Sequence, residues 1–411
     1  MASQAAKVGI RVARRHLSVV SDSQHIEGFA HSNGDLAAYG DGCSAAPGRF
    51  DAAGLGSLRG ERGHGYHEGR GSGDAEDDER IPCIVSSYAG YSKKGYAPYN
   101  PRKRNQDALI MAEDPSTASL FLAVLDGHGE FGDKVAQVFR RHLAPAIFDH
   151  PDWEASPETA VAESIASVER KLLDDPSVDT DFSGTTLVSV CIRGTQLVLT
   201  NVGDSRITLG RRRMSRQGEG VARGGTGCWG RGSLVAQPLT EDHKPDTPTE
   251  KQRILCAGGR VFSVEYADGI DGPPRVWLGN MDTPGLAMSR SLGDAIAHTA
   301  GVTSDPDTYR CETVGARVAV GARSSTRLAA KGTGGSGYLP GEAVVLILAT
   351  DGLWEFVTDQ EAVDIASECS EPRQAVERLI HEASERWMKR EQVIDDTTVC
   401  VAFFKSWTGM N

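Results

Sequence analysis

Aspartate residues beside apolar, strand-like runs are the feature that most limits what this chain can form. The run at 121–125 leads into Asp126 in LDGHGEFG. The same arrangement recurs at Asp107 in RNQDALI, Asp204 in LVLTNVGDSR, Asp351 in VVLILATDGLWE, and Asp395 with Asp396 in VIDDTTVCVAFF. One such aspartate is typical of a turn, because Asp tolerates the backbone angles of turns. Five such places indicate a shared site if the strands have one common end.

Carboxylates that converge in this way predict a metal site. Packed carboxylates repel one another unless cations lie among them. Oxygen ligands without clustered His or Cys select Mg²⁺ or Mn²⁺ rather than zinc. A plain turn remains the alternative at Asp126, and a local ion pair between Asp204 and Arg206 remains the alternative at Asp204.

The spacing of apolar residues predicts a chain of mixed helices and strands. We expect strands at 121–125, 187–192, 196–202, 343–349 and 397–404, and helices at 134–148, 157–173, 249–257, 359–368 and 373–389. Segments rich in Gly, Arg or Ser interrupt these elements near 211–234 and 314–340. Because both interruptions lie between motifs that otherwise look continuous, we interpret them as surface loops of one domain.

The composition excludes several classes of protein. The chain has 411 residues and a formal net charge of -12, which argues against a general nucleic-acid binder because the phosphate backbone would repel it. The apolar run at 343–349 is far shorter than the roughly 20 residues of a membrane-spanning helix. The eight cysteines form no CxxC pair, which indicates free thiols in a reducing compartment. A monomer is the default expectation, since the sequence shows no heptad pattern.

The two ends of the chain differ in character from the middle. Residues 1–80 are rich in Gly, Ser, His and charge, which predicts disorder, and 406–411 form a tail. Lys7, Arg11, Arg14 and Arg15 precede the first acid, Asp22, so residues 1–21 are a targeting segment or a basic disordered tail. We expect a cytoplasmic or nuclear location, with organellar import as the alternative.

Nine motifs occur in the order found in one enzyme family. They are RKRNQD, LDGHG, SGTTL, NVGDSR, LTEDHKP, EKQRILCAGGRV, GLAMSRSLGD, LATDGLWEFV and DDTTV. Together they make residues 81–405 resemble the metal-dependent type 2C (PPM-type) protein serine/threonine phosphatases. The resemblance implies an α+β fold, a four-layer α-β-β-α sandwich of two antiparallel sheets flanked by helices, and phosphoprotein substrates. The net charge and the short apolar run lead us to expect neither nucleic acid nor membrane as a partner.

The resemblance also implies a centre of two Mg²⁺ or Mn²⁺ ions, with a weaker third in some members. Asp126 matches the acid that bridges two ions, and the Gly127 carbonyl matches a ligand of one of them. Asp351 and Asp395 match carboxylate ligands of the other ion, and Asp107 matches an acid that acts through water. The looser third site corresponds to these residues: Asp204, Asp351 and Glu355.

Two more residues have implied roles in hydrolysis by direct attack of a metal-bridging water. Arg102 matches the guanidinium that binds the substrate phosphate, which suits the fixed fork of an arginine. His128 matches the general acid that protonates the leaving alcohol.

Three positions depart from the family pattern. Gln106 stands in place of Glu, Asp396 in place of the Asn after the last ligand, and Glu355 in place of a shorter Asp. Asp396 therefore competes with Asp395 as the ligand. We expect Asp242 and His243 to form a hydrogen-bonded loop rather than to take part in catalysis.

Two other functions remain open from the sequence. A catalytically silent, phosphatase-like protein would bind phosphoproteins or regulate a partner. An RNA-associated protein acting through the Arg-Gly segments rests on composition alone.

Overall fold

Two antiparallel sheets form the centre of the molecule. The computed structural model describes residues 84–212, 234–266, 269–314, 317–324, 337–338 and 342–404, so the expectations for 1–80, for 213–233 and for the tail lie outside the described residues. The larger sheet contains, in spatial order, β16 (Gly337–Tyr338), β15 (Arg317–Ser324), β14 (Asp307–Val314), β7 (Gln196–Val202), β6 (Leu187–Arg193), β3 (Ser119–Leu125) and β2 (Ala108–Asp114). The smaller sheet contains β1 (Val85–Lys93), β18 (Thr397–Phe404), β17 (Glu342–Ala349), β8 (Arg206–Arg212) and β9 (Leu234–Pro238).

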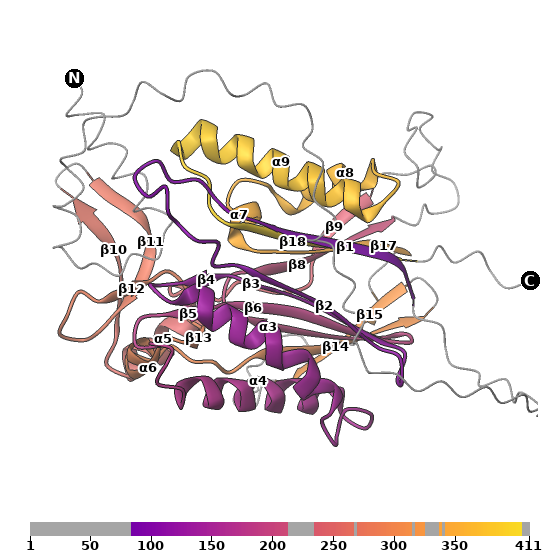
Figure 1. Cartoon of the computed structure of the whole chain (residues 1–411), viewed down its shortest axis with the longest axis horizontal. Coiled ribbons are helices and arrows are strands. Elements are labelled where there is room, and N and C mark those ends of the chain that lie inside the picture. The colour runs from indigo at the N-terminus through magenta and orange to yellow at the C-terminus, as the bar shows by residue number, and fades with distance from the viewer. Residues whose placement is uncertain are drawn as a thin grey trace, which may run out of the picture.

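Helices cover the outer face of each sheet. In Figure 1, α8 (Asp359–Ser367) and α9 (Pro372–Glu391) lie on the smaller sheet, while α3 (Gly132–Phe148) and α4 (Pro157–Leu173) lie on the larger one. Three apolar clusters fill the three spaces between these layers. The strands β3, β17 and β18 are buried on both faces, because each lies between a helical layer and the opposite sheet. The expected α-β-β-α sandwich is therefore confirmed.

Two three-stranded sheets lie beside the sandwich. One contains β10 (Arg260–Tyr266), β11 (Gly269–Trp277) and β12 (Pro284–Leu286), and it packs with α5 (Pro248–Cys256) and α6 (Ala295–Thr299). The other contains β13 (Leu292–Gly293), β5 (Gly184–Thr185) and β4 (Gly127–His128). This second sheet joins segments that lie far apart in the sequence, and it borders the candidate site.

The expected elements agree with the structure to within two residues at each end, but one expectation was wrong. Within the segment 314–340, which we expected to be a surface loop, β15 pairs with β14 and β16 pairs with β15. The sequence of β15, RVAVGARS, has no clear apolar–polar alternation, and its Gly, Arg and Ser content is typical of a loop. Pairing at the sheet edge satisfies its backbone groups.

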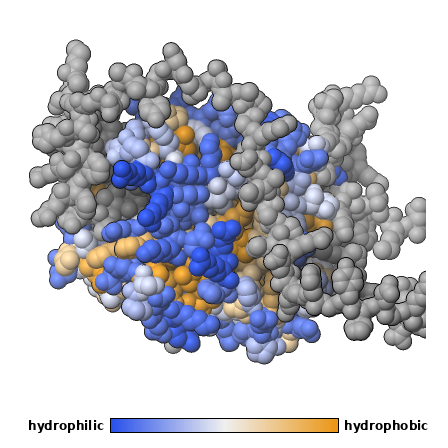
Figure 2. All heavy atoms as spheres, viewed as in Figure 1, coloured by the Kyte–Doolittle hydropathy of each residue, from blue (hydrophilic) through white to orange (hydrophobic). Residues whose placement is uncertain are grey.

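The described surface carries no extended apolar helix. None of the helices in the described ranges has the length and apolar character needed to cross a membrane. Hydrophilic residues cover most of the face seen in Figure 2, with smaller apolar areas between them. The large apolar side chains instead fill the layers between the sheets and helices.

A buried ion-pair network ties α5 to the segment before β13 and to β14. The Glu250 carboxylate accepts hydrogen bonds from Arg290 (2.9 and 3.1 Å) and from Ser289 Oγ (2.7 Å). Arg253 Nη1 lies 2.8 Å from the same carboxylate, and Arg290 also donates to Asp307 (2.9 Å). Burial alone would raise the pKa of Glu250, but the hydrogen bonds from Arg290 and Arg253 outweigh it and lower the pKa to about 2.

Truncating the layer between the sheets should destabilise the whole fold. Leu348 on β17 is fully buried among side chains of both sheets. We expect Leu348→Ala to lower the free energy of unfolding by about 2–5 kcal/mol, because it loses apolar burial and leaves a cavity. Leu173, at the exposed end of α4, offers the matched control, for which Leu173→Ala should change stability by less than about 0.5 kcal/mol. Denaturant unfolding of both variants measures the difference, and equal stability losses would contradict the assigned core.

The Glu250 network should make stability depend on acid pH. Because its folded pKa is depressed, Glu250 contributes stability above its unfolded value of about 4.5 and loses it as pH falls towards about 2. The free energy of unfolding of the wild type should therefore exceed that of Glu250→Gln by roughly 3 kcal/mol less at the acid end of that range than at the upper end. Unfolding curves at a series of pH values measure it. Glu377→Gln, on the solvent-facing side of α9, is the control that should show no such trend. A stability difference between the wild type and Glu250→Gln that stays constant with pH would contradict the prediction.

Candidate active site

Asp126 occupies a tight connection between β3 and β4. The backbone of Asp126 is held by Thr186, whose N–H donates to the Asp126 carbonyl (2.9 Å) and whose Oγ1 accepts from the Asp126 N–H (3.1 Å). The next residue, Gly127, lies where the backbone passes close to the segment that contains Gln106. A Cβ there would lie 2.4 Å from the Gln106 carbonyl oxygen, so a larger residue would push the two segments apart.

Asp107 approaches the same place from the start of β2. Its Oδ2 accepts hydrogen bonds from Thr350 Oγ1 (3.0 Å) and Thr398 Oγ1 (2.7 Å), which come from the ends of the neighbouring strands β17 and β18. Its Oδ1 is buried without a hydrogen-bond partner. Asp351 begins α7 (Asp351–Trp354) directly after Thr350, and Asp395 lies just before β18. Four acids from separate segments thus converge.

The electrostatics show that these carboxylates lie close enough to disturb one another. Burial, followed by repulsion from Asp351, Asp107 and Asp395, raises the pKa of Asp126 well above its usual value. Burial, followed by Asp204 and Asp395, raises the pKa of Asp351 to about 7. The pKa of Asp107 is also raised, mainly by burial and then by Asp396. Such carboxylates favour either a bound proton or a bound cation.

Asp395 and Asp396 are distinguished by their contacts. The Asp396 carboxylate accepts from Gly95 N (2.6 Å) and Gln106 N (2.9 Å), so it joins three backbone segments. Lys103 lies between the two acids, 2.9 Å from Asp395 and 3.0 Å from Asp396. Burial would lower the pKa of Lys103, but these two carboxylates outweigh it and raise the pKa. Asp396 therefore has a structural position, although it also acts on Asp107. Asp395 is the member of the pair that acts on both Asp126 and Asp351.

Asp204 lies at the end of β7 and has a cationic partner, which is not the one considered from the sequence. Its Oδ2 lies 2.5 Å from Lys244 Nζ, whereas Oδ1 is buried without a partner. Arg206 instead donates to Asp242 (2.8 and 2.9 Å), so the local pair between Asp204 and Arg206, which the sequence left open as an alternative, is not formed. As expected, Asp242 belongs to a structural hydrogen-bonded loop.

Two of the candidate residues stand apart from the buried cluster. Arg102 is exposed, and it is its neighbour Lys103 that contacts the acids. Glu355 is also exposed, one turn after Asp351, and its backbone N–H donates to the Asp351 carbonyl (2.8 Å).

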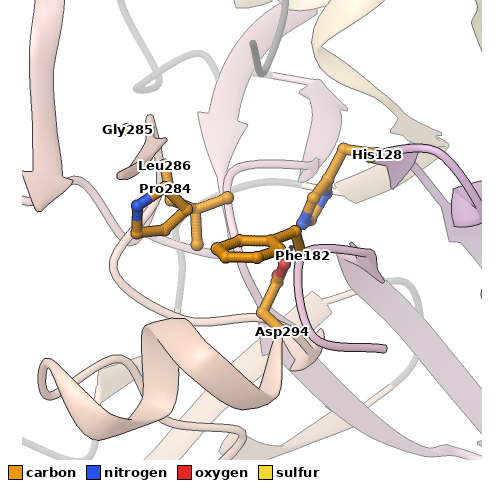
Figure 3. A pocket seen from close by; sticks show the side chains of 7 residues that line it. His128, Phe182, Pro284, Gly285, Leu286 and Asp294 are labelled. Atoms are coloured by element: carbon orange, nitrogen blue, oxygen red, sulfur yellow. Dashed lines mark hydrogen bonds and ion pairs between the residues drawn. The ribbon is translucent and has the colours of Figure 1, made fainter. Parts of the chain in front are cut away.

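His128 lies next to the acids on β4 but faces another carboxylate. Its Nε2 is 2.6 Å from Asp294 Oδ2, and both side chains are buried. Burial would lower the pKa of His128, but Asp294 outweighs it and raises the pKa. Figure 3 shows the two side chains pointing towards each other beside a small pocket lined by Phe182, Pro284, Gly285 and Leu286.

The oxygen atoms of the cluster suit a hard cation. Asp107 Oδ1 and Asp204 Oδ1 are buried acceptors without a partner, and carboxylate oxygens are the ligands that Mg²⁺ prefers. In the described part of the chain, no group of three or more acidic, His or Cys side chains is arranged to hold a metal ion by itself. Mg²⁺ commonly takes only one or two carboxylates and keeps several waters, so the residues present fit such an ion.

Sequence reasoning missed the cations and hydroxyls that stabilise this cluster. Lys103, Lys244, Thr350 and Thr398 all contact candidate residues, although each lies in or beside a recognised motif. The signal that could have found the two lysines is the requirement that buried acids be paired.

Comparison with known proteins agrees with this geometry. The family model of protein phosphatase 2C matches residues 100–316 and 338–390. Probable protein phosphatase 2C 64 of Oryza sativa subsp. japonica is 31% identical over 337 residues, which cover 78% of this chain and 68% of that protein. Probable protein phosphatase 2C 35 of Arabidopsis thaliana is 26% identical over 341 residues, which cover 79% of this chain and 85% of that protein.

Solved structures share the fold. A serine-threonine phosphatase 2C from Toxoplasma gondii superposes with a TM-score of 0.59 at 22% identity, covering 79% of this chain and 98% of that chain. A sex determining protein of C. elegans gives a TM-score of 0.53 at 18% identity, covering 78% and 65%. The family model covers more than half of the chain, so the chain belongs to the protein phosphatase 2C family of protein-serine/threonine phosphatases.

Proposed function

We propose that this phosphatase removes phosphate from phosphoserine and phosphothreonine side chains of proteins with the help of Mg²⁺ or Mn²⁺ at the buried carboxylate cluster. The observation that carries the proposal is the convergence of Asp107, Asp126, Asp351 and Asp395, whose mutual repulsion raises several of their pKa values. Cations would relieve this repulsion, since they bind the ionised carboxylates.

The side chains suggest how the ions would be held. The residues that would hold them are Asp126, the carbonyl of Gly127, Asp351 and Asp395, with Asp107 in a supporting role. Asp396 is less suited, because its carboxylate is already occupied by two backbone N–H groups and Lys103. When bound, a pair of divalent cations supplies charge neutralisation of the phosphate and a lower pKa for the attacking water.

Lys244 affects whether this chain can bind the third metal ion that the family resemblance allows. Its ammonium group already neutralises Asp204, and Glu355 lies on the exposed side of α7. A third ion bound by Asp204, Asp351 and Glu355 would have only Oδ1 of Asp204 available, because Lys244 holds Oδ2, and it would lie close to the ammonium charge. We therefore infer that two ions suffice in this chain.

Two residues of the chain would act on the substrate itself. Arg102, exposed beside the cluster, can extend its guanidinium to the phosphate oxygens in the bidentate way that lysine cannot. His128 would give a proton to the departing serine or threonine oxygen, because an alkoxide is a poor leaving group. We further propose that the catalytic domain spans residues 81–405 and acts as a monomer in the cytoplasm or nucleus.

Metal removal together with one substitution tests the mechanism. Hydrolysis of a phosphothreonine peptide should require Mn²⁺ or Mg²⁺ and stop in excess chelator. Asp351→Asn should lower kcat by about 10²-fold or more, since the ions contribute several kcal/mol of transition-state stabilisation. The variant should also bind Mn²⁺ more weakly in calorimetry, which reports on the site without depending on turnover.

The matched control removes an acid of the same kind from the surface. Asp364 lies exposed on α8, where it accepts a hydrogen bond from Gln360 (2.9 Å). Asp364→Asn should retain both turnover and Mn²⁺ affinity. Turnover that persists in excess chelator would rule out the metal mechanism. A metal-replete wild type without turnover would favour the alternative, a catalytically silent protein that binds phosphoproteins.

A further inference from the structure

The pairing of His128 with Asp294 joins the motif LDGHG to the motif GLAMSRSLGD, to which the proposed mechanism gives no role. Asp294 ends the motif SLGD, and its Oδ2 lies 2.6 Å from His128 Nε2. The side chains are 7% and 2% exposed, so bulk water does not compete for this hydrogen bond. A charge-assisted bond this short and this buried can fix the orientation of an imidazole ring.

The three-stranded sheet β13-β5-β4 brings the two residues together. Gly184, of the motif SGTT, pairs with His128 on one side and with Gly293 on the other. A Cβ on Gly184 would lie 2.2 Å from Asp294 Oδ2. Gly184 is therefore the residue that leaves room for the carboxylate to reach the imidazole.

The backbone around Asp294 is held from several directions. Asp294 has left-handed backbone angles (φ 45°), and its N–H donates to the Ser183 carbonyl (3.0 Å). The preceding Gly293 N–H donates to the buried Glu169 carboxylate on α4 (3.1 Å). A non-glycine residue in this conformation persists only where the surroundings enforce it. The fixed backbone thus directs the Asp294 carboxylate towards His128.

The pairing also distinguishes the two ring nitrogens. A carboxylate only accepts hydrogen bonds, so Asp294 requires the hydrogen of His128 to reside on Nε2. His128 Nδ1 is buried and makes no hydrogen bond with a side chain of the described residues, although the backbone of Asp126 acts on the imidazole. Nδ1 is therefore the nitrogen that remains able to exchange a proton with a bound substrate.

We propose that Asp294 is the positioning residue for His128, fixing the imidazole so that Nδ1 delivers the proton to the leaving serine or threonine oxygen. This inference rests on the proposed role of His128 as the acid. As the P–O bond to the side chain breaks, its electron pair stays on that oxygen, which takes the Nδ1 proton. The attacking water forms the new P–O bond, and the proton it releases returns to His128 through solvent. The products are inorganic phosphate and the free alcohol.

The surroundings of the pair support this assignment. Phe182, Pro284 and Leu286 line the small pocket beside it, so the neighbouring wall is largely apolar (Figure 3). An apolar wall strengthens the bond between carboxylate and imidazole, because the local dielectric constant is low.

A double-mutant cycle with two substrates tests the proposal. Asp294→Asn keeps the shape of the side chain and tolerates left-handed backbone angles. On a phosphothreonine peptide with saturating Mn²⁺, we expect kcat to fall by about 10- to 100-fold, as for other residues that orient a reacting group, with KM unchanged. On p-nitrophenyl phosphate the loss should be much smaller, since p-nitrophenolate departs without a proton. In a His128→Ala background, Asp294→Asn should add no further loss.

Two more variants sharpen the result. Gly184→Ala keeps the charge of Asp294 but displaces its carboxylate, so it should reproduce the selective loss on the peptide. Asp181→Asn removes an exposed carboxylate from the adjacent loop and should retain activity on both substrates. Thermal unfolding of every variant verifies that the fold is retained.

The outcomes separate this inference from the proposed function. Equal losses on both substrates, or losses that add to those of His128→Ala, would show that Asp294 acts only on the fold and would overturn the inference. If His128→Ala loses activity selectively on the peptide and Asp294→Asn does not, His128 is the acid but Asp294 is not its positioning residue. If His128→Ala loses the same activity on both substrates, the role of His128 as the acid is wrong, and so is the inference about Asp294.

Discussion

Repulsion among buried carboxylates is the constraint on which the rest of the site depends. Asp107, Asp126, Asp351 and Asp395 approach one another at one end of the sandwich, at a cost that no apolar packing offsets. The fold places cations and donors around them. Lys103 and Lys244 neutralise the flanking acids, and Thr350 and Thr398 donate to Asp107. The remaining bare oxygens are what a divalent cation would bind.

The sandwich holds the repelling carboxylates in place because rigid backbone segments approach one another closely around them. The acids lie at strand ends or in short connections, so the sandwich core fixes their separation. Beside them, the small sheet β13-β5-β4 holds His128 against Asp294, and the Glu250 network fixes the segment that leads into that sheet. The groups of the candidate site are thus positioned by elements whose own side chains are locked, which is what the proposed proton transfer and phosphate binding require.

Much of the fold could be predicted, because its strongest elements have strong periodicity. The fully apolar strands and the amphipathic α4 and α9 came within two residues of their observed ends. Edge and irregular strands could not be predicted in this way. The strand β15 was taken for a loop, and β10 and β11 were not expected, since their pairing depends on partners rather than on their own sequence. The positions of Asp126 and Asp351 followed from local sequence, but their partners did not.

The sequence by itself determined which residue types stand at each strand end, and these are the residue types on which the proposed metal site rests. It also determined the family, because nine short motifs occur in order. Only the tertiary structure decided which charges meet. It paired Asp204 with Lys244 rather than with Arg206, assigned Asp396 to backbone N–H groups, and directed His128 at Asp294. These choices depend on distances of a few ångströms between segments as many as 301 residues apart, and no local pattern encodes such distances.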